Sequence, residues 1–395
     1  MLVAAVIAGL TGNLLASCSK PAAEETAEAA VFTPVPDLSA PIEFSESVVM
    51  EDTPGTKGLD PVDGALEGIK HQRFGVFSWW NPRADAFDAL TNPANIYQSN
   101  SDVVFVEDLS SDLRKWRCTP RAYWPFSCNL SFFAYAPYLE HTQPWEEGGE
   151  TRQPELMFPS ADYTQGMPRA TYSPDTNVTH QVDFCIAAPV FDREPSPTPI
   201  HFAFKHSTTR IRLFVKADGD RPPGYDYRID DAIISGVVGT NTFTYNDDPD
   251  RPFIWDAVTA STPKSGEYHL SVNDAELSES MVNMISEHPG SDISTYTAIN
   301  SRPNGRLYLL PQELTSDASL ELAIGMYNIS SGAPIRNSIL PPFKVNLPVS
   351  QAWNPAQTIA YLITVDVSRY VVLDIVPLVI PWVDAGNTHP DQIIY

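Results

Sequence analysis

Cys18 is the side chain whose sequence setting most directly implies a covalent reaction. It follows Leu15-Ala16-Ser17 and closes an uncharged apolar run that begins at Met1. Small residues and a cysteine after such a run are typical of a bacterial lipoprotein signal, in which the cysteine is acylated and becomes the N-terminus. Each buried CH₂ of an acyl chain contributes about 0.8 kcal/mol, so several chains hold a protein on a membrane. The run is shorter than the roughly 20 residues that a membrane-spanning helix needs.

This signal lacks one common feature. No Lys or Arg precedes Cys18, whereas secretory signals normally begin with a positively charged segment. We therefore expect the true start of translation to lie upstream of Met1. Residues 19–37 are rich in Ala, Glu, Thr and Pro and poor in bulky apolar side chains, so we expect a flexible tether there.

Three further cysteines remain if Cys18 is acylated, namely Cys118, Cys128 and Cys185. Cys118 and Cys128 are ten residues apart and flank Tyr123-Trp124-Pro125. In an oxidising compartment a disulfide could join them across this turn, and two buried free thiols are the alternative. The chain has no Cys-x-x-Cys pair, which argues against a zinc ribbon or a thioredoxin-type site.

Other polar side chains could bind a metal ion. His201 and His206 fall on opposite faces of an extended strand, so we do not expect them to share an ion, and we expect His206 to be packed or hydrogen-bonded. Two acidic loops offer the oxygen ligands that calcium prefers, but neither has EF-hand spacing, and such turns are usually solvated. These loops contain Asp218, Asp220, Asp226, Asp230 and Asp231, and Asn246, Asp247, Asp248 and Asp250. The sequence therefore predicts no metal site.

Carboxylates and aromatic rings could also serve a carbohydrate site. Glu146, Glu147 and Glu150 could include the two carboxylates, about 5–10 Å apart, that a glycosidase needs, although a mobile acidic loop explains them better. Trp116 and Trp145 have polar neighbours, and if exposed they could stack on sugar rings. The chain has no Gly-x-Ser-x-Gly elbow, no His-Glu-x-x-His and no P-loop, so we expect no catalytic residue and no cofactor.

Composition indicates an exported protein that is built from strands. The chain has 395 residues, which is enough for two domains behind a signal and a tether. Its 36 scattered prolines favour short strands and many turns over long helices. Its 49 acidic and 25 basic residues give a net charge of −24, which repels phosphates and excludes nucleic acid as a partner.

Alternating apolar positions and aromatic-rich runs predict the strands that would position these side chains. We expect strands at 41–48, 74–80, 103–106, 130–138, 182–190, 200–205, 210–215, 227–237, 241–245, 267–272, 306–310, 319–328, 342–347, 358–367 and 370–380. One helix is expected near 274–286.

The clearest linker is residues 192–199, where three prolines fall within five positions. The strand at 200–205 is expected to open a second unit directly after it. We therefore predict an all-β chain with a signal at 1–18, a tether at 19–37, and sandwich domains at 38–195 and 196–395. Long polar loops and even strand spacing favour Greek-key connections.

Four segments in order resemble the fimbrillin-like proteins of the Bacteroidales, the subunits of type V pili. The first is Tyr123-Trp124-Pro125 followed by Leu130–Tyr138, and the second is the strand from Ile200 to Ile211. The third is Tyr308–Gln312, and the fourth runs from Trp353-Asn354-Pro355 to Val365. The position after Asn354-Pro355, where the family usually has glycine, is Ala356.

The resemblance implies two tandem transthyretin-like domains and an architectural role. Subunits of this family reach the outer membrane as lipoproteins, lose their leader and first strand to a protease, and accept a strand from a neighbouring subunit. In this sequence the displaced strand would carry Ile42, Phe44 and Val48, and the cut would fall at Lys57 or Arg73. The incoming strand would come from Val371–Val383.

The resemblance thus implies partners of three kinds: other pilus subunits, the outer membrane through the lipid on Cys18, and a host glycan or protein. The expected location is the cell surface, as a stalk, tip or anchor subunit of a fimbria. The alternative is a surface lipoprotein that binds a glycan or a host protein without polymerising.

Overall fold

The computed structural model describes residues 34–45, 48–49, 73–88, 95–108, 113–158, 167–218, 223–271, 293, 296–300, 307–333, 335, 342–366, 369 and 371–380. These residues form strands, turns and isolated bridges, and none of them is in an α-helix. Accordingly, no helix of the described part has the length and apolar character to cross a membrane. The all-β prediction is confirmed, whereas Cys18, Lys57 and the helix predicted near 274–286 lie outside the described residues.

The strands of the first half are β1 (Pro36–Pro41), β2 (Glu43–Phe44), β3 (Val48–Val49), β4 (Phe74–Pro82), β5 (Ile96–Asp108), β6 (Leu113–Thr119), β7 (Tyr123–Pro125), β8 (Cys128–Ala136), β9 (Trp145–Glu147), β10 (Glu150–Arg152), β11 (Leu156–Met157), β12 (Arg169–Tyr172), β13 (Cys185–Ala187), β14 (Val190–Arg193) and β15 (Ala203–His206). Those of the second half are β16 (Thr209–Asp218), β17 (Tyr225–Val237), β18 (Asn241–Tyr245), β19 (Phe253–Trp255), β20 (Gly266–Ser271), β21 (Thr297–Ala298), β22 (Leu307–Leu309), β23 (Ser319–Asn328), β24 (Phe343–Asn346), β25 (Gln357–Asp366) and β26 (Val371–Ile380).

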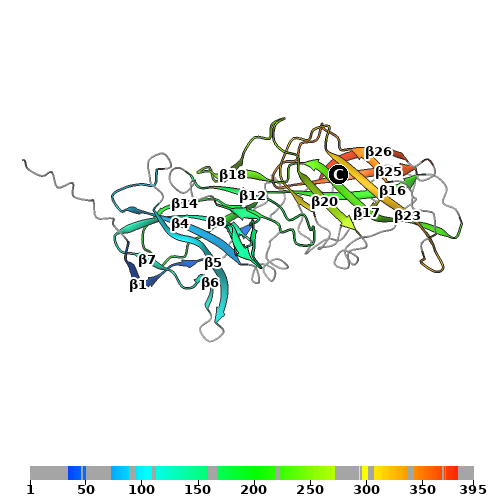
Figure 1. The fold of residues 1–395 in the computed structure, drawn as a ribbon. Coiled ribbons are helices and arrows are strands. Elements are labelled where there is room, and N and C mark those ends of the chain that lie inside the picture. The colour runs from blue at the N-terminus through cyan, green and yellow to red at the C-terminus, as the bar shows by residue number, and fades with distance from the viewer. Residues whose placement is uncertain are drawn as a thin grey trace, which may run out of the picture. The chain divides into compact units, whose positions relative to one another are not determined.

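The largest sheet has the strand order β2-β6-β5-β4-β8-β13-β15-β3, with β14 paired to β8. Figure 1 labels its strands β4, β5, β6, β8 and β14. Its central strands β4 and β8 are the two aromatic-rich runs that the sequence predicts. Both are buried on both faces: Phe74 and Phe132 enter one apolar cluster, and Phe77 and Phe133 enter another. Period-two alternation explains this arrangement, since successive side chains of a strand point to opposite faces.

One strand lies in a different sheet from the one predicted. The run at 200–205 was expected to open the second unit, but β15 pairs with β13 in the large sheet, with Cys185 opposite His206. The reason is its inward face, because Ile200, Phe202 and Phe204 complete the same apolar cluster as Phe74. The second set of sheets begins with β16, and the domain division between 195 and 196 stays a prediction.

The second half contains two sheets that share one core. One has the order β21-β16-β25-β26, with β22 also paired to β16, and the other has the order β20-β17-β23-β24. Ile211 and Tyr361 from the first sheet and Ile234 and Leu320 from the second lie in one buried cluster, so the two sheets form a sandwich.

A further sheet, β11-β12-β18-β19, takes strands from both halves of the chain and places Tyr172 and Phe243 in one cluster.

Two of the sequence motifs meet in space. Gln312 and Trp353 exchange backbone hydrogen bonds of 2.9 and 2.8 Å, and the Trp353 indole donates to the Tyr361 hydroxyl at 2.8 Å. Three residues after Trp353, Ala356 has φ = 56°, in the left-handed region that favours glycine. The chain therefore carries alanine at a turn whose backbone conformation suits glycine.

Candidate functional site

The first described segment, residues 34–45 and 48–49, bonds to strands on both of its sides. On one side β1 pairs with β7, and β2 pairs with β6 so that Phe44 lies opposite Trp116. On the other side Phe44 forms a parallel bridge with Ile200, and β3 pairs in parallel with β15. Because β2 and β3 stand at the two ends of the large sheet, this segment closes the sheet upon itself.

Backbone hydrogen bonds fix the segment in this place. Ser45 N–H donates to the Ile200 carbonyl at 2.8 Å, and Ile200 N–H donates to the Glu43 carbonyl at 2.9 Å. Across the segment, Ile42 N–H donates to the Ala122 carbonyl at 2.9 Å. Removing the segment would leave unpaired backbone groups along both sides of a slit, and such open edges are templates for another strand.

The side chains of Ile42 and Phe44 point into the apolar cluster of the large sheet, and both are fully buried. The Phe44 ring centroid lies 5.7 Å from those of Phe74 and Phe202 and 6.2 Å from that of Phe132. Fully burying an aliphatic or aromatic side chain contributes about 1.5–3 kcal/mol, so this pair contributes about 3–6 kcal/mol. Ile42 and Phe44 thus lie in the core of the first half, whereas for Val48 only the backbone pairing is described, and displacement of this strand stays a prediction.

Polar contacts hold the segment more weakly. His201 Nδ1 lies 3.0 Å from the Ser45 hydroxyl, and Arg121 lies 3.7 Å from the Glu43 carboxylate. Exposed pairs of this kind contribute about 0–1 kcal/mol. The segment is therefore held mainly by apolar packing and by its backbone ladder.

Arg73, the candidate cleavage residue, stands immediately before β4. Its guanidinium donates to Asp102 at 2.9 Å and lies 5.0 Å from the centre of the Tyr138 ring, while its carbonyl accepts a bond from Tyr138 N–H. The side chain is about half exposed. A protease acting here would have to release these contacts, and cleavage at Arg73 or Lys57 stays a prediction.

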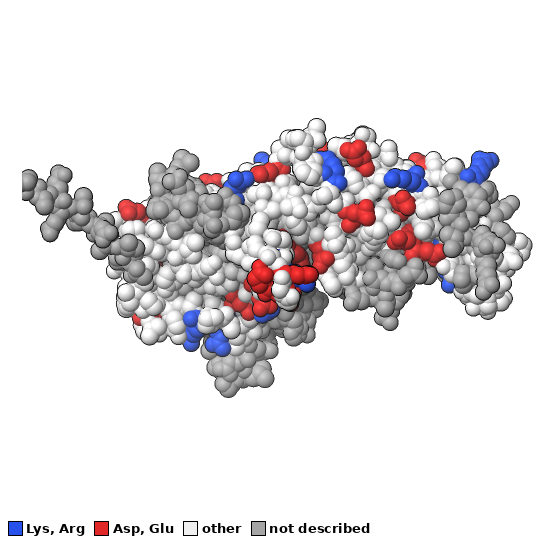
Figure 2. Space-filling model, in the orientation of Figure 1, with Lys and Arg blue, Asp and Glu red and all other residues white. Residues whose placement is uncertain are grey.

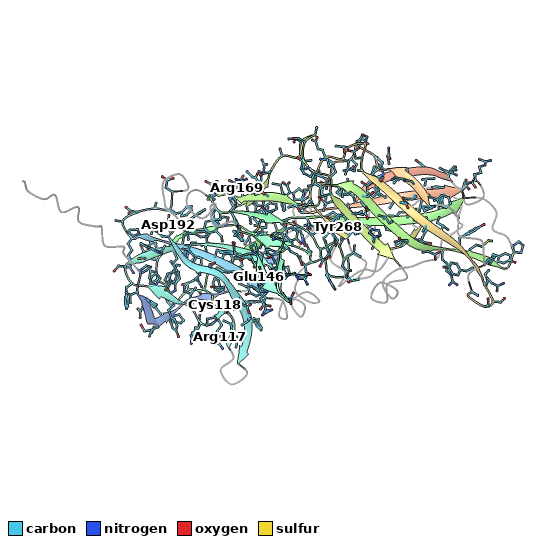
Figure 3. The ribbon with its side chains drawn as sticks, in the orientation of Figure 1. Arg117, Cys118, Glu146, Arg169, Asp192 and Tyr268 are labelled. Carbon is cyan, nitrogen blue, oxygen red and sulfur yellow. The ribbon has the colours of Figure 1, made fainter. Side chains whose placement is uncertain are left out.

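Cys118 and Cys128, the pair considered for a disulfide, are both buried free thiols in the structure. Cys118 lies on β6 beside Arg117 (Figure 3), in the same apolar cluster as Ile42 and Phe44. The Gln98 amide donates to its sulfur at 3.3 Å. Burial raises the pKa of Cys118 to about 12, so this thiol is unreactive while the segment covers it.

Trp116, considered above as a ring that could be exposed and stack on sugars, is buried. Its ring is only 2% exposed and packs against those of Phe74 and Phe105, each at 5.3 Å. Its polar neighbour Arg117 is no guide to its exposure, because adjacent residues of a strand face opposite ways. Trp145 is half-buried and stacks on His141, with ring centres 4.1 Å apart and planes 8° apart.

The carboxylates near Trp145 lie on an exposed hairpin formed by β9 and β10. Arg152 pairs with Glu147 at 3.5 Å and with Glu150 at 3.3 Å, and the Thr151 hydroxyl donates to Glu146 at 2.6 Å. These partners give each carboxylate a structural role on the hairpin. More widely, Figure 2 shows acidic side chains in several groups on one face, consistent with the net charge of −24.

The C-terminal described strand β26 is the second notable surface. It stands at the end of its sheet and pairs only with β25 among the described strands (Figure 1). Val371, Leu373, Val376, Leu378 and Val379 expose 43, 45, 43, 37 and 47% of their surface, and Asp374 is its one charged residue. β26 also carries Pro377, and its pairing with β25 has a register shift, both of which are common in edge strands. Its row of exposed apolar side chains makes it a candidate interaction surface.

The sequence identified the apolar character of β26 and of the first segment. It missed the role of Ile200–His206, which provides one side of the slit that the first segment fills. The alternation of Ile200, Phe202 and Phe204 was visible, but the sheet that would receive it was not.

A comparison with solved structures finds several that are similar to this chain. A fimbrial protein from Bacteroides vulgatus is 17% identical, covers 87% of this chain and 100% of its own, and has a TM-score of 0.57. A proposed cell adhesion protein from Bacteroides uniformis is 14% identical, covers 88% of this chain and 100% of its own, and has a TM-score of 0.42. The fimbrial anchor protein Mfa2 from Porphyromonas gingivalis is 12% identical, covers 78% of this chain and 89% of its own, and has a TM-score of 0.25. At these identities the likeness concerns the fold. No protein-family model and no curated protein sequence matches the chain.

Proposed function

We propose that this protein is a structural or adhesive subunit of a fimbria at the cell surface, assembled by exchange of β-strands. Its N-terminal signal would deliver it to the outer membrane with lipid on Cys18. Cleavage at Lys57 or Arg73 would then free the segment that carries Ile42, Phe44 and Val48. The slit so opened would take a strand from another subunit, as in β-strand addition.

This proposal is carried by the combination of a first segment that could be removed and an apolar strand, β26, that stands at the end of its sheet among the described strands. The first segment closes the large sheet mainly through two apolar side chains and a backbone ladder, both of which another apolar strand could reproduce. β26 is an apolar edge strand of ten residues, long enough to span β1 and β2 together. The fold shared with the Bacteroides vulgatus fimbrial protein supports the same function.

The test treats the purified chain with an arginine-specific protease and follows assembly on unboiled SDS gels. We expect wild-type protein to form SDS-resistant ladders only after cleavage, and Arg73→Ala to prevent both cleavage and ladders if this is the site. Val376→Asp on β26 should prevent ladders without preventing cleavage. Val349→Asp changes an exposed valine outside β26 and should have no effect. A cleaved product that stays monomeric would exclude assembly by strand exchange.

A second candidate function is capture of a glycan or host protein without assembly. Two features favour it: the half-buried stack of Trp145 on His141, and a groove of about 530 Å³ lined by Trp255, Asp256, Glu313 and Asn354 among others. Aromatic and carboxylate side chains in a concave site suit sugar recognition. Trp145→Ala and Trp255→Ala should abolish binding on a glycan array. Unchanged binding in both variants would remove this candidate.

A further inference from the structure

A buried cluster of three metal-ligating side chains lies where β13 meets β15. Asp183 and Cys185 are two residues apart, and His206 lies opposite Cys185 in the antiparallel register. The Cys185 sulfur is 3.6 Å from His206 Nδ1 and 3.8 Å from Asp183 Oδ1, and these last two atoms are 2.8 Å apart. All three potential ligand atoms thus lie within 4.8 Å of one another.

We propose that Asp183, Cys185 and His206 bind a zinc-type divalent metal ion through Oδ1, Sγ and Nδ1. Tetrahedral zinc with bonds of about 2.3 Å to sulfur and about 2.0–2.1 Å to nitrogen and oxygen requires ligand separations of about 3.6 Å to sulfur and about 3.4 Å between nitrogen and oxygen. Both sulfur distances already fit. Only the Nδ1–Oδ1 hydrogen bond must open, by about half an ångström.

The same distances exclude a nucleophilic Cys–His pair as the purpose of the cluster. In such a pair one ring nitrogen faces the nucleophile and the other faces the orienting carboxylate. Here the Cys185 sulfur and the Asp183 carboxylate approach the same nitrogen, Nδ1. Nδ1 thus faces both the sulfur and the carboxylate, as it would if the three atoms held one ion.

The setting supplies both burial and access. Cys185 and His206 are almost fully buried, whereas the Asp183 side chain is 26% exposed, so an ion and a fourth ligand such as water could enter from its side. Thiolate and imidazole ligands suit zinc better than they suit calcium or magnesium.

A buried hydroxyl lies near the cluster. The Tyr172 hydroxyl is fully buried and lacks a hydrogen-bond partner among the residues that the structure describes. Its pKa is raised by burial and by the charges of Glu155, Tyr268, Asp183 and Cys185, so it lies within electrostatic range of the cluster.

The ion would fasten β15 to β13. Since β15 is also the strand that receives β3 and follows Ile200 at the slit, the site would stiffen one side of the opening. The site itself does not depend on the proposed fimbrial function.

The test titrates the reduced full chain with Co²⁺, a spectroscopic substitute for zinc. We expect one equivalent to produce a thiolate-to-cobalt charge-transfer band in the near ultraviolet, and zinc to displace it. Cys185→Ser should abolish the band, and Asp183→Asn and His206→Asn should each weaken binding about tenfold or more. Cys118→Ser, which changes another buried thiol of the same apolar cluster, should leave the band intact.

A second measurement covers variants that fail to fold. In wild-type protein, one equivalent of Zn²⁺ should slow alkylation of Cys185, read by peptide mass spectrometry, and leave Cys118 and Cys128 unchanged. Absence of the cobalt band at one equivalent, or equal protection of all three thiols, would show a hydrogen-bonded structural cluster without a metal site.

Discussion

Replacing Phe44 by alanine should make the first segment leave its place beside β15 more easily, without unfolding the rest of the protein. The Phe44 ring is fully buried and touches the rings of Phe74, Phe132 and Phe202. Truncating a buried phenylalanine to alanine costs about 3–5 kcal/mol. Because the segment has few other apolar anchors, we expect this loss to appear as easier release of the segment.

Cys118 provides the assay, because its buried thiol lies in the apolar cluster that the segment covers. A thiol reagent can modify it only when the segment leaves. At about 1.4 kcal/mol for each factor of ten, Phe44→Ala should accelerate labelling of Cys118 by about two to three and a half orders of magnitude. Peptide mass spectrometry would separate this reaction from labelling of Cys128.

Two controls make the result decisive. Leu38→Ala lies in the same segment, but Leu38 is 73% exposed, so labelling should stay close to the wild-type rate. Cys128 lies outside the cluster and reports global unfolding. If Phe44→Ala labels Cys118 no faster than Leu38→Ala does, or if Cys118 and Cys128 accelerate equally, the segment is not a separately removable closure.

Three further predictions concern stability. Ala356→Gly should raise the free energy of unfolding, measured by urea titration, by about 0.5–1 kcal/mol, since it relieves about 1–2 kcal/mol of left-handed strain and loses part of this gain to the larger conformational entropy of glycine in the unfolded state. Gly236→Ala should destabilise the fold measurably by circular dichroism, because φ is +72° and a new Cβ would fall 2.0 Å from the Asp317 carbonyl oxygen; a wild-type melting curve would contradict this. Burial and then the Asp175 charge raise the pKa of Glu155 to about 7, so the folded state holds a proton that the unfolded state releases, and stability should fall as pH rises from about 4.5 to about 7. Glu155→Gln should flatten that slope in thermal melts across this range, while Glu147→Gln on the exposed hairpin should leave it unchanged.

The sequence was sufficient for the class of fold and for the character of its main strands. Aromatic and β-branched runs at 74–80 and 130–138 predict buried strands, and β4 and β8 occupy those positions. The alternation of Ile42 and Phe44 predicts an inward-facing first strand, and both side chains are buried. Local periodicity carries this information because the two faces of a strand alternate residue by residue.

The sequence was insufficient wherever the result depends on which distant strands meet. The run at 200–205 has the alternation of a strand, but only pairing with β13 assigns β15 to the first sheet. Trp116 has charged neighbours in sequence and is nevertheless buried, because its ring packs against Phe74 and Phe105.

The candidate metal cluster shows the same division. The two-residue spacing of Asp183 and Cys185 allows them to share one face of a strand, and this much is present in the sequence. The third member, His206, is 21 residues beyond Cys185 and becomes their neighbour only through the antiparallel register of β13 and β15. The sequence thus determined the faces of the strands, through local side-chain alternation. The tertiary structure alone decided which faces and edges meet, since that depends on the joint burial of apolar clusters from distant parts of the chain.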